Sequence, residues 1–223
     1  MPESTVGTPG SVRRMILVPA LITLAVTVLR LIGELLHGSS RFFNSSAGGG
    51  GAIIGIVWLA PVFGIYFAVK LARAGQGPRS AGKAIGWTVL GIVICVLGGL
   101  VGFAPQVHLP GKELIGYAVM ALGAATVVLG WPILFKTLIA YAYAARVPVL
   151  IIMFFAILGS WGTHYDALPP MYAGPNSFWP KFFVLAFLPQ MIFWVAFTIL
   201  AGALFGSVVA AFVGRKQAAQ KAP

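Results

Sequence analysis

Residues 84–104 read AIGWTVLGIVICVLGGLVGFA, an apolar stretch that contains no Asp, Glu, Lys, Arg or His. Its 21 residues match the roughly 20 that an α-helix needs to cross the hydrocarbon core of a bilayer. Comparable stretches recur along almost the whole chain, separated by short segments that hold Gly, Pro and nearly all the charge. The chain is 59% hydrophobic and only 9% charged, whereas a soluble domain has about 25% charged residues. The sequence therefore predicts an α-helical integral membrane protein.

The apolar stretches predict an all-α, polytopic fold with about six transmembrane helices. The expected spans are residues 15–36, 52–71, 84–104, 114–135, 147–162 and 190–214. They make up one transmembrane domain over residues 15–214, which lies between an N-terminal tail (1–14) and a basic C-terminal tail (215–223).

Three prolines are expected to shape these spans, because proline lacks the amide hydrogen that a helix interior uses. Pro61 should kink the second span, and Pro132 should mark the last turns of the fourth. The fifth span is short and could borrow a turn from the residues before it. Pro189 is expected to separate an interfacial lead-in from the sixth span.

Lys and Arg are distributed unevenly between the two ends of the expected spans. One side holds three, Arg41, Lys112 and Lys181, and Arg30 lies within the first span. The other eleven of the fifteen are Arg13, Arg14, Lys70, Arg73, Arg79, Lys83, Lys136, Arg146, Arg215, Lys216 and Lys221. Because cytoplasmic flanks retain an excess of Lys and Arg, both termini are predicted to be cytoplasmic.

The net charge of +11 is placed at the ends of spans rather than on a soluble face. This placement indicates anionic lipid on the cytoplasmic face as a partner, and not nucleic acid. The expected location is the cytoplasmic (inner) membrane of a bacterium.

Glycines at helical spacing predict where helices pack closely, since lipid offers no hydrophobic drive for helix association. The candidates are Gly98 and Gly102, the heptad-spaced Gly116, Gly123 and Gly130, and Gly202 with Gly206. Another glycine run, residues 48–51, comes just before the second span.

Ionisable residues that could carry chemistry concentrate on the expected outer side, where all three histidines and three of the four acids fall. The loop 162–170, GTHYDALPP, is the densest polar cluster, and its two prolines limit its freedom. Catalytic candidates are Glu34, His164 and Asp166. The candidate ligands of a divalent metal are His37, His108, His164 and Glu113, although no H-E-x-x-H motif announces such a site.

Three polar residues are expected inside the membrane: Arg30, Glu34 and Gln190. Arg30 and Glu34 are four apart, which places them on one helical face and favours an ion pair. An ion pair of this kind either stabilises the fold or orients a polar side chain towards a pocket.

No motif in the chain fixes a reaction, so three function classes stay open. The composition favours a noncatalytic accessory or scaffold component, able to form a homo-oligomer or bind other membrane subunits. A small transporter or permease is the alternative, suggested by proline-interrupted spans and by the polar residues within them. A membrane-embedded enzyme with an outer-face His and carboxylate site, with or without a divalent metal, is the third.

Overall fold

The computed structural model describes residues 9–170, 172, 174 and 177–221, and these residues form an all-α bundle. The helices are α1 (Pro9–Leu35), η1 (Ala47–Gly49), α2 (Leu59–Arg73), α3 (Ala81–Phe103), α4 (Lys112–Ala125), α5 (Val127–Gly130), α6 (Pro132–Gly159), α7 (Phe178–Phe182), η2 (Phe183–Phe187), η3 (Pro189–Phe193) and α8 (Trp194–Lys221). Of these, η1 is a 3-10 turn, and η2 and η3 are π-helical turns.

Five helical stretches are long and apolar enough to cross a membrane. They are Ser11–Leu35, Ala81–Phe103, Lys112–Gly130, Pro132–Gly159 and Phe178–Phe212. Their outward faces carry large apolar side chains such as Leu17, Val96, Leu122 and Leu158, each more than half exposed. Such a surface suits a lipid bilayer, because water would be a poor solvent for it.

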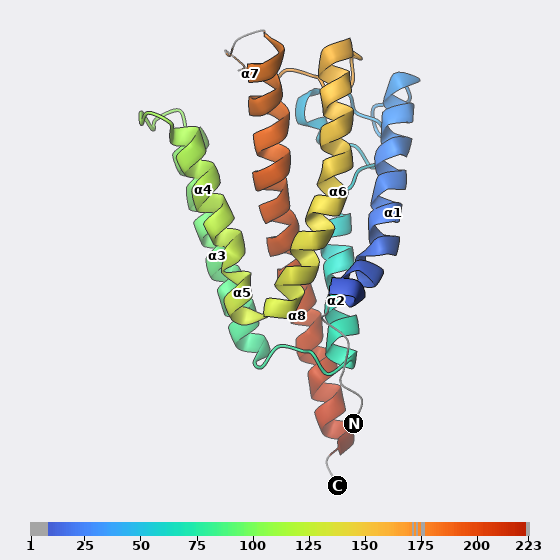
Figure 1. The fold of residues 1–223 in the computed structure, drawn as a ribbon, viewed down its shortest axis with the longest axis vertical. Coiled ribbons are helices and arrows are strands. Elements are labelled where there is room, and N and C mark those ends of the chain that lie inside the picture. Colours follow the sequence, from blue (N-terminus) through green and yellow to red (C-terminus); the bar gives the residue numbers. More distant parts are fainter. Residues whose placement is uncertain (1–8, 171, 173, 175–176, 222–223) are drawn as a thin grey trace.

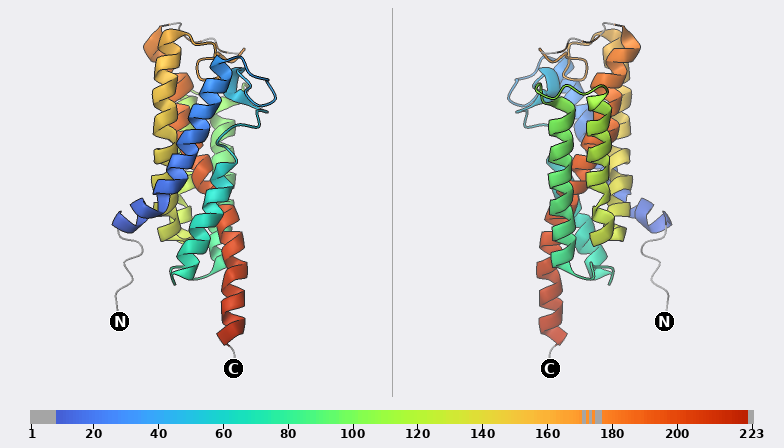
Figure 2. Two further views of the ribbon diagram at one scale, coloured as in Figure 1. Left: turned by 90° about the vertical axis from the view of Figure 1, so that its right-hand side faces the viewer. Right: turned by 90° about the vertical axis from the view of Figure 1, so that its left-hand side faces the viewer.

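The helices run up and down the long axis of the bundle (Figure 1). The described ends of α1 and α8 point to the same end of the bundle, where the α2–α3 connection also lies. The loops after α1, α3 and α6 lie at the opposite end, where the α3–α4 connection is apart from the other two. Figure 2 shows α8 extending beyond the other helices at the end that holds both termini.

Helical structure extends into both of the segments expected to be tails. Helix α1 begins at Pro9, and α8 continues to Lys221, so most of the basic C-terminal segment is helical. Residues 1–8 of the expected N-terminal tail and residues 222–223 lie outside the described residues.

The second expected span differs from the prediction at its start. Residues 52–58 are irregular, and α2 begins at Leu59. Pro61 is therefore the third residue of α2, in the first turn, where the missing amide hydrogen has no intrahelical partner to lose. It starts the helix rather than kinking it.

The fourth and fifth expected spans are divided at a different residue. Trp131 is extended (φ −153°, ψ 83°) and forms a corner between α5 and α6. Pro132 is the first residue of α6, a position that favours proline, and so it does not end the preceding helix. Helix α6 runs unbroken for 28 residues from Pro132 instead of beginning near Val147. Arg146 consequently lies at the middle of α6 and not in a cytoplasmic flank.

Pro189 does not divide the last span. The chain is helical from Phe178 to Lys221, with two π-helical turns around the proline. A wider turn tolerates a residue that cannot donate a backbone hydrogen bond, because the backbone pairing shifts by one residue. Turns of this kind are frequent at functional sites.

The expected glycines lie where α3 packs against α4 and α5 and where α2 packs against α8. In the α3–α4 contact, a Cβ at Gly98 would lie 2.8 Å from the carbonyl oxygen of Gly116, and one at Gly116 would lie 2.7 Å from that of Gly98. A Cβ at Gly206 on α8 would lie 2.7 Å from the carbonyl oxygen of Gly64 on α2. The remaining expected glycines, Gly102, Gly123, Gly130 and Gly202, also face neighbouring backbone. Any side chain at these contacts would push the helices apart.

Candidate functional site

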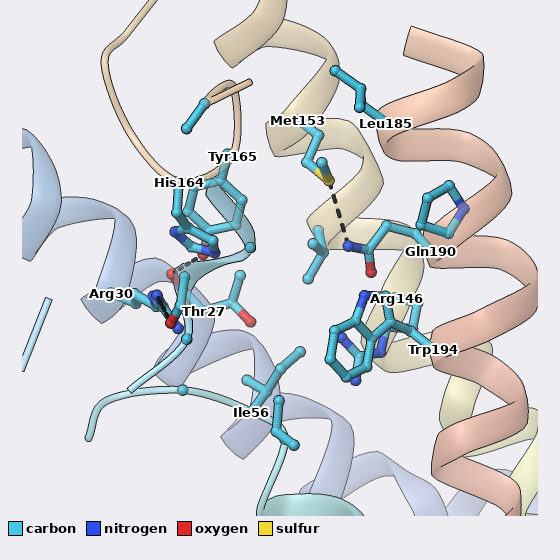
Figure 3. A pocket seen from close by; sticks show the side chains of 18 of the residues that line it. Thr27, Arg30, Ile56, Arg146, Met153, His164, Tyr165, Leu185, Gln190 and Trp194 are labelled. Carbon is cyan, nitrogen blue, oxygen red and sulfur yellow. Dashed lines mark hydrogen bonds between the residues drawn. The ribbon is translucent and has the colours of Figure 1, made fainter. Parts of the chain in front are cut away.

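A cavity of about 730 Å³ lies between α1, α6 and the segment of η2, η3 and α8. Loop residues 48–51 and 164–167 cover part of it. Figure 3 shows Arg30 and His164 on one side of the cavity, and Arg146, Gln190 and Trp194 on the other. The two sides differ in how their buried arginines are paired.

On the first side, an ion pair connects α1 to the loop after α6. Arg30 Nε donates to Glu34 Oε1 over 2.8 Å, and both side chains are buried. The same carboxylate accepts from the backbone N–H of His164 (2.8 Å) and contacts its ring Nδ1 (2.6 Å). We call Arg30, Glu34, His164 and Gly49 the Arg30 cluster.

The glycine run covers the Arg30 cluster from outside. Arg30 Nη2 donates to the carbonyl oxygens of Asn44 (3.0 Å) and Gly49 (2.8 Å). The Asn44 side chain holds the loop by donating to Gly50 O (2.6 Å) and accepting from Ser46 N (3.0 Å). Gly49 has φ +58°, and a Cβ there would overlap the Arg30 guanidinium and the His164 ring. The loop approaches the cluster closely because residue 49 has no side chain.

His164 is held in one orientation. Because a carboxylate only accepts, the ring nitrogen that faces Glu34, Nδ1, carries the hydrogen, and Nε2 has the lone pair in the neutral ring. Burial lowers the pKa of His164 below its ordinary value, although the hydrogen bond to Glu34 acts in the opposite direction. The ring lies against that of Tyr165, with centroids 3.9 Å apart and planes tilted by 42°, and Tyr165 Oη donates to Thr27 O on α1 (3.3 Å). His164 is therefore neutral near pH 7.

Asp166, the other acid of this loop, is occupied by its own turn. Its Oδ2 accepts from Gly162 N (2.9 Å), and its Oδ1 accepts from the N–H (2.8 Å) and the hydroxyl (2.7 Å) of Thr163. These hydrogen bonds to Asp166 stabilise the turn that places His164 beside Glu34.

On the second side, Arg146 is 4% exposed. Within the described part of the chain, no carboxylate lies at ion-pair distance from it, and its Nε has no hydrogen-bond partner. Its guanidinium stacks over the Trp194 ring, 4.8 Å from the centroid. We call Arg146, Trp194 and Gln190 the Arg146 cluster.

Gln190 is the second polar group without a full set of partners. Its Nε2 makes only a weak contact, 3.5 Å, with the Sδ of Met153, and its buried Oε1 has no partner. It belongs to the π-helical turn η3 and lies four residues before Trp194. A buried amide that is left unpaired costs free energy unless something outside the chain pairs with it.

The other residues considered for a metal site do not join the cavity. His37 is exposed beyond the end of α1, with φ +52°. His108 and Glu113 are exposed around the α3–α4 connection, which Figure 1 shows well away from the tip of α1. Among the described residues, no three or more His, Cys, Asp or Glu side chains are grouped so that they could hold a metal ion.

Sequence reasoning missed Arg146 and Gly49 as residues of the site. Arg146 was assigned to a cytoplasmic flank because the helix was expected to begin after it. Pro132 is the signal that could have placed it, since proline favours the first position of a helix. Gly49 was only one glycine of a run, and nothing local distinguishes it from Gly48 or Gly50.

No family model, no curated protein and no solved structure matches this chain. The residues of the cavity are therefore the basis for any functional assignment.

Proposed function

We propose that the protein is a small permease of a bacterial cytoplasmic membrane, with the cavity as its binding site. Five crossings are the long apolar helices, and α2 with the irregular segment before it supplies the sixth. Leaving out Arg30 and Arg146, ten Lys and Arg residues fall at the end of the bundle that holds the termini and three at the other. This asymmetry supports cytoplasmic termini and contact of the basic end with anionic lipid.

The observation that carries the proposal is Arg146. A charged side chain in the middle of a membrane helix is costly, and such residues commonly mark a substrate pathway. Arg146 is 14 residues from the start of α6 and 13 from its end, and it faces a cavity. A buried arginine with a purely structural role is expected to have an anionic partner, as Arg30 has in Glu34.

The segment opposite Arg146 supports the same function. Transporter sites are commonly built where membrane helices depart from regular geometry. Here two consecutive π-helical turns surround Pro189 and present Gln190 to the cavity. The accessory or scaffold role requires only packing surfaces, and it leaves this cavity without a purpose.

The experiment is cysteine labelling from the two sides of the membrane. Cys95 is the chain's single cysteine, so Cys95→Ser gives a background for Met153→Cys, at a buried residue of the cavity. A membrane-impermeant maleimide is applied to right-side-out and inside-out vesicles. A permease alternates its access, so we expect Met153→Cys to react from both sides.

Two exposed positions serve as controls in the same background. His37→Cys should react only from the outside and Lys83→Cys only from the inside, which also tests the orientation. Labelling of Met153→Cys from one side only, with both controls correct, would reject the permease and favour a static site or the scaffold role.

A second candidate function, a membrane-embedded enzyme, is favoured by the Glu34–His164 pair. A carboxylate that holds the Nδ1 hydrogen of a histidine leaves Nε2 available as a general base. In that case Glu34 orients the ring and His164 accepts the proton. Incubation with bacterial lipid extract, followed by mass spectrometry, tests this candidate with His164→Gln as the comparison. Lipids left unchanged by the native protein would reject it.

A further inference from the structure

We infer that the cavity binds a single-chain amphipathic carboxylate, whose headgroup pairs with Arg146 and whose hydrocarbon chain lies along the apolar wall. The inference rests on the proposed ligand-binding role of the cavity and names the class of ligand. It is carried by three features of the cavity: its charge, its unpaired polar atoms and the composition of its walls.

One charge of the cavity, that of Arg146, has no counter-charge among the described residues. Arg30 is neutralised by Glu34, and His164 is neutral near pH 7. Asp166 is held by hydrogen bonds of its own loop. Arg146 is the remaining cation among the described lining residues, and no carboxylate of the described chain pairs with it. The charges of Arg30, Arg146, Glu34 and Asp166 sum to zero over the whole cavity, but Asp166 is held in its own turn. A monoanion beside Arg146 would give this guanidinium the local counter-charge that the described chain does not supply.

The geometry at Arg146 suits a flat anion. A guanidinium presents a planar fork of donors that matches a carboxylate in two parallel hydrogen bonds. The Trp194 ring packs against the guanidinium, 4.8 Å from its central carbon, and Arg146 Nε has no hydrogen-bond partner among the described residues. Gln190 lies one turn before Trp194 and adds an amide without a strong partner. The free hydrogen-bonding capacity of the cavity is thus gathered around one point.

The remaining wall favours hydrocarbon over a small hydrophilic anion. On α6, Val149, Met153 and Ile157 follow Arg146 at helical spacing and line the cavity towards the loops, and Leu185 faces them from η2. Free phosphate or sulfate would leave this wall uncovered. The volume of about 730 Å³ lies within the roughly 300–1,000 Å³ that holds one drug-sized ligand. It favours one chain over the two chains of a phospholipid.

Binding of oleate tests the inference. Tritiated oleate is titrated onto the full-length protein in maltoside detergent and followed by scintillation proximity. We expect saturable binding that oleyl alcohol, with the same chain and no charge, competes at least ten-fold less well. Equal competition by the alcohol would overturn the role of Arg146, and stronger competition by phosphatidylglycerol would overturn the single-chain carboxylate.

Three variants locate the headgroup. Arg146→Leu should weaken oleate binding at least ten-fold, whereas Arg41→Leu, at an exposed arginine of the outer end, should leave it unchanged. Gln190→Glu should likewise weaken oleate binding at least ten-fold. It places a carboxylate one turn from Trp194, so the protein itself then supplies a counter-charge for Arg146. Each variant is first checked by gel filtration for an unchanged elution volume. Its melting temperature must be at least as high as that of the native protein. Native affinity in Arg146→Leu would overturn the inference.

The results separate this inference from the permease proposal. Oleate binding without two-sided labelling of Met153→Cys would keep the ligand class and reject transport. Two-sided labelling without oleate binding would keep transport and overturn the ligand class.

Discussion

Each side of the cavity buries an arginine, but among the described residues only one of the two arginines has a counter-charge. In the Arg30 cluster, the guanidinium is matched by Glu34 and two loop carbonyls, and the carboxylate is matched in turn by His164. In the Arg146 cluster, the guanidinium has an aromatic ring and no anion among the described residues. Both arginines are at most 8% exposed, so burial alone does not distinguish them.

This difference distinguishes a buried charge that stabilises the fold from a buried charge that is available to bind a ligand. A buried charge with a complete set of partners holds elements together, here α1, the glycine loop and the loop after α6. A buried charge without partners raises the free energy of the folded state until something neutralises it. The second kind is the better guide to function.

Removing the counter-charge of Arg30 should have the largest effect. Glu34→Gln keeps the size of the side chain but leaves Arg30 buried without an anion, which costs about 3–5 kcal/mol for a buried pair. We expect a large fall in the melting temperature in detergent, measured by tryptophan fluorescence. Glu113→Gln, at an exposed acid of α4, is the matched control and should melt like the native protein. A Glu34→Gln protein as stable as the native one would remove the contrast between the two clusters.

The glycine loop offers a matched pair of substitutions. Gly48 and Gly49 both have positive φ, +74° and +58°, but a Cβ at Gly48 meets nothing within 4 Å. Gly48→Ala should therefore cost only the backbone strain, about 1–2 kcal/mol. Gly49→Ala adds a clash with Arg30 and His164, which typically costs a further 1–3 kcal/mol or so. Equal melting temperatures of the two variants would mean that the loop does not press on the Arg30 cluster.

Replacing the unpaired arginine should act with the opposite sign. Arg146→Leu removes a buried charge that has no partner, so the ligand-free protein should keep its stability or gain about 1 kcal/mol. Arg30→Leu, the comparison, should lose stability because it strands Glu34. Thermal melting of both variants without added lipid decides the sign, and destabilisation by Arg146→Leu would indicate a structural partner.

The smallest effect is a dependence on pH through His164. Burial lowers the pKa of His164 in the folded protein despite the hydrogen bond that its ring donates to Glu34, whereas the unfolded value is about 6.5. The folded state then binds fewer protons than the unfolded state. The contribution of neutral His164 to stability is fully present above about pH 6.5. As the pH falls below this value, the free energy of unfolding decreases by less than about 1.4 kcal/mol per pH unit. Arg30 adds to the lowering, and Glu34 and Asp166 oppose it.

Melting at pH 7.5 and 5.5 measures this dependence. His164→Gln should melt with a smaller difference between the two pH values than the native protein. His37→Gln combined with His108→Gln should keep the native difference, since both rings are exposed. If the double variant alone flattened the dependence, the titrating group would not be His164.

Much of the bundle could be predicted from local patterns. The apolar stretches place the long helices, and four-residue spacing puts Arg30 and Glu34 at an ion-pair distance of 2.8 Å. The boundaries at Pro61, Pro132 and Pro189 were wrong. A proline is compatible with a first turn, a break or a wider turn, and the choice among these depends on the neighbouring helices.

The sequence by itself determined that the chain is made of apolar helices suited to a bilayer, because length and hydropathy are properties of single segments. It also determined that Arg30 has a carboxylate one turn away. Only the tertiary structure decided that Glu34 meets His164, 130 residues further along, and that Gly49 rather than Gly48 approaches Arg30 and His164. It also decided that Arg146 faces a cavity without an ion-pair partner among the described residues. Such contacts depend on how whole helices and loops pack, and no local pattern of residues carries that information.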